Sequence, residues 1–423
     1  MNAIALSRLL SYGNESPLDR ILAELSLPAV EWQEILRQSR RHSVAPLLYH
    51  RLKQADAGSV LPVEVWGKLQ SLYLRSAAIN GSLYRDLAEA LTCLQASGIA
   101  VIILKGGYLA RHVYDNIALR PMGDFDLLVK EADLLRANDL LVELGYRVSR
   151  NADTEALIAK YYHLPPLIKA GKIPASIELH WKLERPSARF EIDTEELWRR
   201  AQPAAFGEAR ASALCPEDLL LHLCIHASYH HQFRFGLRSL CDIAEIIRHY
   251  HSRLDWEQLR ERAEEWGVTK CVYLTLRLTN KLLEANVPHD VLQHLRPKEL
   301  RHSFVAMSEA FTLGDIGDPF IFRKFGSLWK NGRWRDKLMI VKNSALPAQK
   351  TMARLYPAAH SNRRYNFYYH KRWQDLLRRF GPIVWQMLRR KKQMNDLVAD
   401  EKKRLVLKQW LADSNAKLLN DNA

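Results

Sequence analysis

The sequence lacks the features that mark several protein classes. Its five cysteines are scattered, odd in number and include no CxxC pair, which argues against a disulfide framework and against a structural zinc site. No uninterrupted apolar run reaches the roughly 18–20 residues that a membrane-spanning helix needs. The N-terminal residues show no basic leader, long apolar core or small-residue cleavage site. We therefore expect a cytoplasmic protein.

Two common catalytic signatures are missing as well. No G-x-S-x-G segment is present, so a serine nucleophile with His and Asp partners has no support. The segment LKGGYLA lacks the G-x-x-x-x-G-K-S/T spacing of a Walker loop. At 48% hydrophobic and 26% charged residues, the 423-residue chain has the composition of a soluble protein and the length for two or three domains.

Hydrophobic periodicity divides the chain into four regions. Residues 1–95 carry apolar residues at helical spacing and form an expected N-terminal helical region. Residues 96–185 change to β-branched and alternating segments, which predict a compact core of strands and helices. Residues 186–310 again predict helices, and residues 311–423 are basic, aromatic and broken by Gly and Pro into short helical pieces. This order predicts an α+β protein with helical regions on both sides of a small sheet.

The most informative segment runs from residue 99 to residue 129. It reads as an apolar strand, a Gly-Gly turn, a short helix and a second strand that carries Asp124 and Asp126. Because residues two apart in a strand share a face, the two carboxylates project together, with Phe125 and Leu127 turned toward the core. Adjacent carboxylates repel each other unless a cation lies between them. The pair therefore indicates a divalent metal site.

Further residues extend this pattern. Glu178 lies on a cleanly alternating segment, PASIELHWKL, and supplies a third carboxylate if that strand pairs beside the second one. Three such carboxylates can hold two Mg²⁺ ions, the arrangement used for in-line phosphoryl or nucleotidyl transfer. Gly106 and Gly107 allow a tight turn whose backbone N–H groups can bind phosphates at a helix N-terminus. Lys105 and Arg120 lie nearby in the sequence and are candidates to neutralise a triphosphate.

Together these segments resemble a bacterial family of uncharacterised nucleotidyltransferases within the DNA-polymerase-β-type superfamily. The resemblance rests on LKGGYLARHVYDN…LRPMGDFDLLV, on IELHW and on LLLHLCIHASYHHQFRF…LCDIAEII, and covers roughly residues 30–300. It implies a mixed-sheet, polymerase-β-like core with metal ligands at Asp124, Asp126 and Glu178 and a signature turn at Gly106 and Gly107.

The resemblance also implies an activity. We expect a Mg²⁺-dependent enzyme with two ions that transfers an NMP group from an NTP, with ATP as the first candidate, to an acceptor hydroxyl. Members of the family often accompany polysaccharide or peptide-modification gene sets. Two alternatives stay open, a catalytically silent nucleotide-binding or membrane-associated module and a template-independent enzyme that extends nucleic acids.

Several residues have a structural interpretation beside the functional one. Lys105 and Arg120 either contact the substrate or act as structural partners of the acidic pair. His222, His226 and His230 recur every four residues on one helix face, a spacing that also occurs in transition-metal sites. The favoured interpretation is that this helix packs against the sheet, with some of its histidines facing the active-site cleft.

Basic charge is concentrated near the C-terminus. The net charge is +15, but residues 320–410 hold 23 Lys or Arg and only 5 Asp or Glu. The clusters at residues 378–380 and 389–393 interleave with aromatic residues, as in segments that lie on an anionic membrane surface. Nucleic-acid binding and a solvated helical tail are the alternatives. A peripheral location at the inner membrane face is accordingly one expectation.

Overall fold

A computed structural model describes most of the chain in two compact units. The described residues are 2–12, 29–148, 158, 161–185, 188–314, 370, 374, 378 and 391–413. The first unit comprises residues 1–315 and 407–423, and the second comprises residues 316–406. No helix among the described residues is both long enough and apolar enough to span a bilayer.

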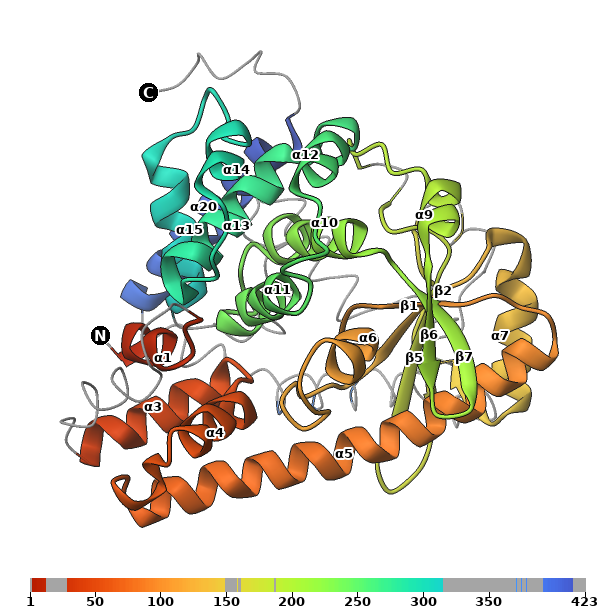
Figure 1. Cartoon of the computed structure of the whole chain (residues 1–423), viewed down its shortest axis with the longest axis horizontal. Helices are drawn as coiled ribbons and strands as arrows, with labels where there is room; N and C mark the ends of the chain where they lie inside the picture. Colours follow the sequence, from red (N-terminus) through yellow and green to blue (C-terminus); the bar gives the residue numbers. More distant parts are fainter. Residues whose placement is uncertain are drawn as a thin grey trace. The chain divides into compact units, whose positions relative to one another are not determined.

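The N-terminal helices lead into one long helix that reaches the sheet. They are α1 (Asn2–Leu9), α3 (Ala29–Arg41), α4 (Ala45–Gln54), η1 (Ala57–Ser59) and α5 (Val63–Ala96). At about 1.5 Å per residue, the 34 residues of α5 extend roughly 50 Å, from α4 at one end to the sheet at the other (Figure 1). Asn80 of α5 donates hydrogen bonds to the carbonyls of Ile117 and Arg120, and thereby holds the loop that carries Arg120.

A seven-stranded mixed sheet forms the centre of this unit. Its strands are β1 (Ile102–Leu104), β2 (Phe125–Leu128), β3 (Tyr146–Val148), β4 (Leu167–Lys169), β5 (Ala175–His180), β6 (Gln202–Phe206) and β7 (Ala209–Ala213). Their order is β3-β4-β5-β2-β1-β7-β6. β2 runs antiparallel to β1 and parallel to β5, so the strand of Glu178 lies beside the acidic strand, as a site of three carboxylates requires. All four residues of β2 are buried, because the sheet is covered on both faces.

One part of the sheet differs from the sequence interpretation. Residues from 190 to 300 were expected to be helical, but β6 and β7 form a hairpin there, and β7 joins the edge of β1 in parallel. The hairpin turns at Gly207, whose φ of +69° is accessible to glycine at little steric cost. Its strands are rich in alanine and contain Pro203, so they carry little β-branched signal. Pairing with β1 overrides this weak local preference.

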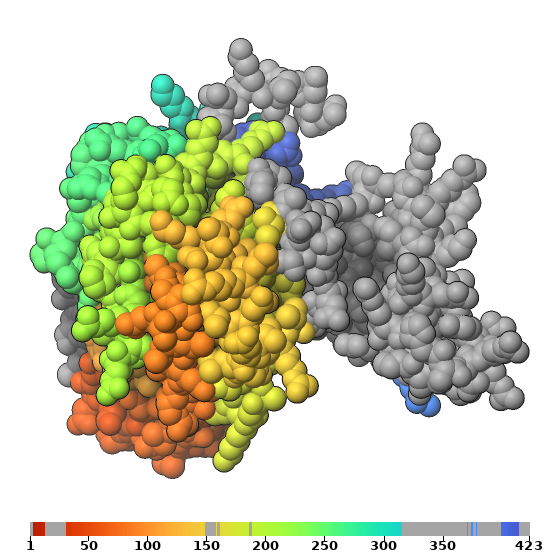
Figure 2. Space-filling view, turned by 90° about the vertical axis from the view of Figure 1, so that its right-hand side faces the viewer, coloured from red at the N-terminus to blue at the C-terminus, as the bar shows by residue number. Residues whose placement is uncertain are grey.

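Helices cover the two faces of the sheet (Figure 1). On one side lie α5, α7 (Leu134–Glu143) and, before α7, the short η2 (Glu131–Asp133). Figure 2 shows this side, with the orange residues of α5 next to the yellow-orange residues of α7. The other side carries α6 (Lys105–His112), α10 (Pro216–Ile225), the π-helical turn η3 (His226–His230) and α11 (Leu237–His249).

The remaining helices complete the helical region. They are α9 (Thr194–Arg200), α12 (Trp256–Glu265), α13 (Thr269–Leu283), α14 (His289–His294), α15 (His302–Leu313) and α20 (Lys391–Ala412). The end of α20 belongs to the first unit, where Trp410 stacks on Phe304 with ring centroids 4.6 Å apart. Apart from Arg378, the clusters at 378–380 and 389–393 lie outside the residues whose side chains are described, so the membrane and nucleic-acid interpretations stay predictions.

Candidate active site

The strand register brings two of the predicted acidic residues side by side. Leu104 of β1 pairs with Asp126 of β2, and Asp126 pairs in turn with Glu178 of β5. Directly paired residues of neighbouring strands share a face, so both carboxylates project from the same side of the sheet. His180, two residues beyond Glu178, lies on that side as well. The site is therefore built on the three central strands, which are held by ladders on both edges.

Two hydrogen bonds converge on one oxygen of Asp126. Lys105 Nζ donates to Asp126 Oδ1 at 2.9 Å, and His180 Nε2 donates to the same atom at 2.9 Å. Lys105 follows β1 directly and adopts φ of +47°, a left-handed conformation that is strained for a residue with a Cβ. Because both donors use Oδ1, Oδ2 of Asp126 remains available for a ligand.

These contacts decide the charge states at the centre of the site. Burial opposes ionisation of Asp126, but the charge of Lys105 and the hydrogen bond from His180 lower the pKa of its carboxyl below the ordinary value. Burial also opposes the charge of Lys105, whereas Asp126 raises the pKa of that amine. Burial lowers the pKa of His180 to about 4. Lys105 and Asp126 therefore form an ion pair, and His180 is neutral with its proton on Nε2.

Glu178 has the opposite electrostatic character. Desolvation and the neighbouring charge of Asp126 raise the pKa of its carboxyl to about 7. His163 Nδ1 lies 3.8 Å from Glu178 Oε2, and His180 Nε2 lies 3.9 Å from the same atom. Asp126 is thus held ionised while Glu178 takes up a proton near neutral pH. Such a divided pair is typical of sites that handle a proton or a cation.

Asp124 lies at the edge of this arrangement. It immediately precedes β2 and its side chain is exposed. Partial desolvation and the charge of Asp126 raise the pKa of Asp124, while Lys105, Arg120 and Arg238 act in the opposite direction. The group of potential metal ligands that lie within 4.8 Å of one another consists of Asp126, Glu178 and His180, and does not include Asp124.

The glycine turn packs against a buried arginine. A Cβ atom on Gly106 would overlap the guanidinium of Arg120, and one on Gly107 would contact Phe125 at 2.8 Å. Arg120 binds Asp242 of α11 through Nε at 3.0 Å and through Nη2 at 2.9 Å. These two bonds leave Nη1 beside Gly106 at the start of α6. Arg120 therefore has a structural partner and also one nitrogen at the turn.

The predicted histidine face lines the same site. His222 and His226 are influenced electrostatically by Lys105, and burial lowers the pKa of both imidazoles well below the ordinary value. His230 Nε2 lies 2.6 Å from Glu184 Oε1, and His231 Nε2 lies 3.2 Å from His226 Nε2. Among the described residues, these histidines do not form a group with metal-ligand spacing. His222 and His226 therefore contribute neutral imidazoles to a wall of the site.

The sequence interpretation missed two neighbours of this site. Tyr162 and His163 precede β4, and the ring of Tyr162 lies between those of His180 and His230, with centroids 5.6 and 5.9 Å away. An isolated β-bridge joins His163 to His180. No motif marks this short Tyr-Tyr-His segment, because only the bridge brings it to the site.

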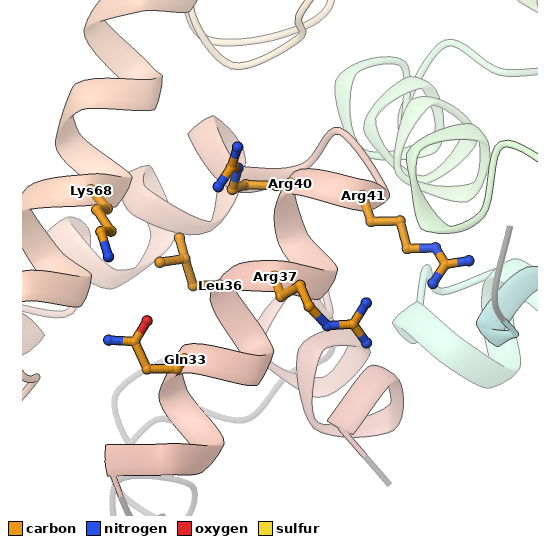
Figure 3. Close-up of a pocket in the computed structure, with 6 residues that line it drawn as sticks. All are labelled: Gln33, Leu36, Arg37, Arg40, Arg41 and Lys68. Carbon is orange, nitrogen blue, oxygen red and sulfur yellow. The ribbon is translucent and has the colours of Figure 1, made fainter. Parts of the chain in front are cut away.

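A second, unrelated hollow lies between α3 and α5. It has a volume of about 550 Å³ and is lined by Gln33, Leu36, Arg37, Arg40, Arg41 and Lys68 (Figure 3). Arg37 pairs with Glu34, and Lys68 pairs with Glu64. The hollow contains no carboxylate among its lining residues and offers no metal site.

The acidic site fits a divalent cation. Asp126 Oδ2 is uncommitted, Glu178 is destabilised by a like charge, and oxygen donors of this kind are the ligands that Mg²⁺ prefers. A cation between the two carboxylates relieves the repulsion that raises the pKa of Glu178. The residues present therefore suit the ion that the sequence pattern implies.

Comparison with known families gives one match. The pattern of the family described as "Uncharacterised nucleotidyltransferase" matches residues 28–284, which include every residue of the acidic site and the histidine face. No match is found among curated proteins or among solved structures.

Proposed function

Because the chain belongs to the family of uncharacterised nucleotidyltransferases, we propose that it transfers an NMP group from an NTP to an acceptor hydroxyl. The acceptor oxygen attacks the α-phosphorus, the bond from that phosphorus to the β-phosphate oxygen breaks, and pyrophosphate leaves. The core is taken to be of the polymerase-β type, ATP is the first donor to test, and substrates of polysaccharide or peptide modification are the first acceptors.

One observation supports this proposal most strongly. Asp126 and Glu178 are paired residues of adjacent parallel strands and lie beside the glycine turn that opens α6. Carboxylates on paired strands next to free N–H groups at a helix N-terminus suit a metal–triphosphate substrate. The paired carboxylates and the N-terminus of α6 come from separate parts of the chain, and the fold brings them together.

Each residue then has a role that follows from its contacts. Asp124, Asp126 and Glu178 hold Mg²⁺, with two ions expected, which supplies Lewis-acid polarisation of the phosphate and acceptor oxygens when bound. Glu178 also helps to deprotonate the acceptor hydroxyl. Lys105 orients Asp126 through its hydrogen bond.

The glycine turn and Arg120 act on the nucleotide. The backbone N–H groups of Gly106 and Gly107 at the start of α6 bind phosphate oxygens, as does Lys105 when the substrate displaces it from Asp126. Arg120 contributes Nη1 at the same turn and keeps its other contacts with Asp242. These roles assign the triphosphate to the α6 side of the acidic strands.

The test is nucleotide binding followed by turnover. Calorimetry with ATP, with and without Mg²⁺, on the wild type and on Asp126→Asn should show metal-dependent binding that the variant loses. Release of pyrophosphate in the presence of candidate acceptors then measures transfer. A wild type that binds no NTP under any condition would contradict the proposal.

A silent nucleotide-binding module is the second candidate. It is favoured by the ion pair between Lys105 and Asp126, which already neutralises the central carboxylate without a metal. A silent module should bind Mg²⁺–ATP and yet release no pyrophosphate with any acceptor. Binding and turnover measured on the same preparation therefore separate the two candidates.

A further inference from the structure

The neighbours of Arg238 do not balance the charge of its guanidinium. It is the second residue of α11, it is half-buried, and its guanidinium carbon lies 4.8 Å from the ring centroid of Phe235. Among the described residues no carboxylate lies within ion-pair distance of it. A largely desolvated guanidinium without an anion is costly, so the contact with an aromatic face is only part of its expected environment.

The carboxylate nearest in sequence is already occupied. Asp242 lies one helical turn beyond Arg238, the spacing at which an ion pair is expected on a helix. Both oxygens of Asp242 instead bind Arg120, and Oδ1 also accepts a hydrogen bond from the hydroxyl of Tyr114 at 2.7 Å. Arg238 is thus left beside a second guanidinium and without the carboxylate that would balance it.

Two further charges act on Arg238. It lies in the first turn of α11, where the helix dipole disfavours a cation, and no acidic residue lies in that turn. The carboxylate of Asp124 influences it across the site. Burial and the charge of Arg120 lower the pKa of Arg238, in keeping with a guanidinium that lacks a strong anionic partner.

Two sets of contacts relate Arg238 to residues near the acidic site. Phe235, beneath it, packs against the ring of His231 with centroids 4.1 Å apart, and His231 is influenced electrostatically by Lys105. Asp242, one helical turn beyond Arg238 on α11, holds Arg120, whose Nη1 lies beside Gly106. Arg238 therefore completes a row of cationic and N–H donors that begins at the start of α6.

We propose that Arg238 forms a second phosphate subsite, which binds the β- and γ-phosphates that leave as pyrophosphate. This inference rests on the proposed function, because it assigns the anion to the donor nucleotide. The planar guanidinium matches phosphate oxygens in a bidentate manner, and the face of Phe235 fixes its plane. The subsite lies in the helical region, on a helix that follows both strands of the acidic site in the sequence.

The experiment compares ligands that differ only in their phosphates. Calorimetry with Mg²⁺–ATP, Mg²⁺–tripolyphosphate and AMP is carried out on the wild type, Arg238→Gln and Arg238→Lys. Arg253→Gln is the matched control, since Arg253 also lies over an aromatic ring, that of Tyr250 at 4.9 Å. Arg238→Gln should weaken ATP and tripolyphosphate roughly 10- to 100-fold, the effect of losing a charge-assisted contact, with AMP unchanged. The affinities of Arg238→Lys for ATP and tripolyphosphate should lie between those of Arg238→Gln and those of the wild type. Arg253→Gln should bind each ligand as tightly as the wild type does.

The outcomes separate this inference from the proposed function. Equal affinities of the wild type and Arg238→Gln for tripolyphosphate would overturn the subsite, and so would an equal loss for ATP and AMP. Binding of tripolyphosphate that depends on Arg238, in a protein that releases no pyrophosphate, would keep the subsite and refute the transfer reaction. A wild type that binds neither ATP nor tripolyphosphate would refute both.

Discussion

The guanidinium of Arg120 occupies the space that a Cβ atom on Gly106 would fill. Arg120 cannot easily move away, because it is buried and forms two hydrogen bonds with Asp242. The glycine at this position is thus required by packing. The contact joins the start of α6 to α11 across the site.

Gly106→Ala should destabilise the protein by about 1–3 kcal/mol, the usual effect of overpacking a buried contact. Gly81→Ala is the control, because no atom lies within 4 Å of a Cβ there and the residue is in the interior of α5. This control should be about 0.5–1 kcal/mol more stable than the wild type, as expected for alanine in a helix. Urea unfolding of the three proteins measures both effects, and equal stabilities for Gly106→Ala and the wild type would contradict the close contact.

Asp126→Asn and Asp124→Asn should affect stability differently in metal-free protein. Asp126 is the ion-pair partner of a buried lysine, so Asp126→Asn leaves Lys105 uncompensated and should destabilise by roughly 3 kcal/mol. Asp124→Asn removes only a like charge near Asp126 and should leave stability unchanged or slightly higher. Thermal unfolding in the presence of a chelator gives the comparison. An equal loss of stability in both variants would show that Asp126 does not compensate the charge of Lys105.

Glu178→Gln should change the pH dependence of stability. The pKa of Glu178 is about 7 in the folded protein, above its ordinary value, so its ionisation works against folding as the pH rises from about 4.5 to 7. In metal-free protein the variant should therefore be more stable than the wild type at pH 8, by on the order of 3 kcal/mol, and nearly equal to it at pH 4. Mg²⁺ should reduce the difference in stability between the variant and the wild type at pH 8, because it binds the ionised carboxylate of Glu178 in the wild type. A difference that is independent of pH would count against the raised pKa.

His42 should make the fold sensitive to acid. Burial lowers its pKa to about 4, and Nδ1 accepts a hydrogen bond from the backbone N–H of Leu237 at 3.4 Å, at the start of α11. The contribution of the neutral imidazole is complete above pH 6.5 and is lost as the pH falls from 6.5 to 4. His42→Asn keeps an acceptor near the position of Nδ1 but does not titrate, so its stability should fall less over this range. His302→Gln, at an exposed position, is the control and should follow the wild type.

The sequence predicted the parts of the fold that local patterns encode. The alternation around Glu178 predicted a strand, and the structure pairs that strand with the acidic one, the arrangement that a shared metal site requires. The roles of the individual residues stay predictions. The hairpin of β6 and β7 was missed because its alanine-rich strands owe their conformation to pairing with β1.

Contacts between segments that are far apart in the sequence could not be predicted from local patterns. Arg120 and Asp242 are separated by 122 positions, and either could have paired with a nearer residue of opposite charge. The hydrogen bond from His180 to Asp126 depends on the parallel register of β2 and β5, which periodicity alone leaves undetermined. Such pairs follow from tertiary packing, and for that reason the helical spacing of Arg238 and Asp242 does not produce an ion pair between them.

The separation between the acidic strands and the histidine-lined helices has a consequence for how such proteins diverge. Every carboxylate of the acidic site comes from residues 124–178, whereas η3 and α11 belong to residues 226–249. Substitutions in the later segment can reshape the wall of the cleft without disturbing a single backbone hydrogen bond between β1, β2 and β5. Under the proposed function, a lineage can exchange one acceptor for another while the transfer reaction stays the same. A library confined to residues of η3 and α11 is then the starting point for changing the acceptor.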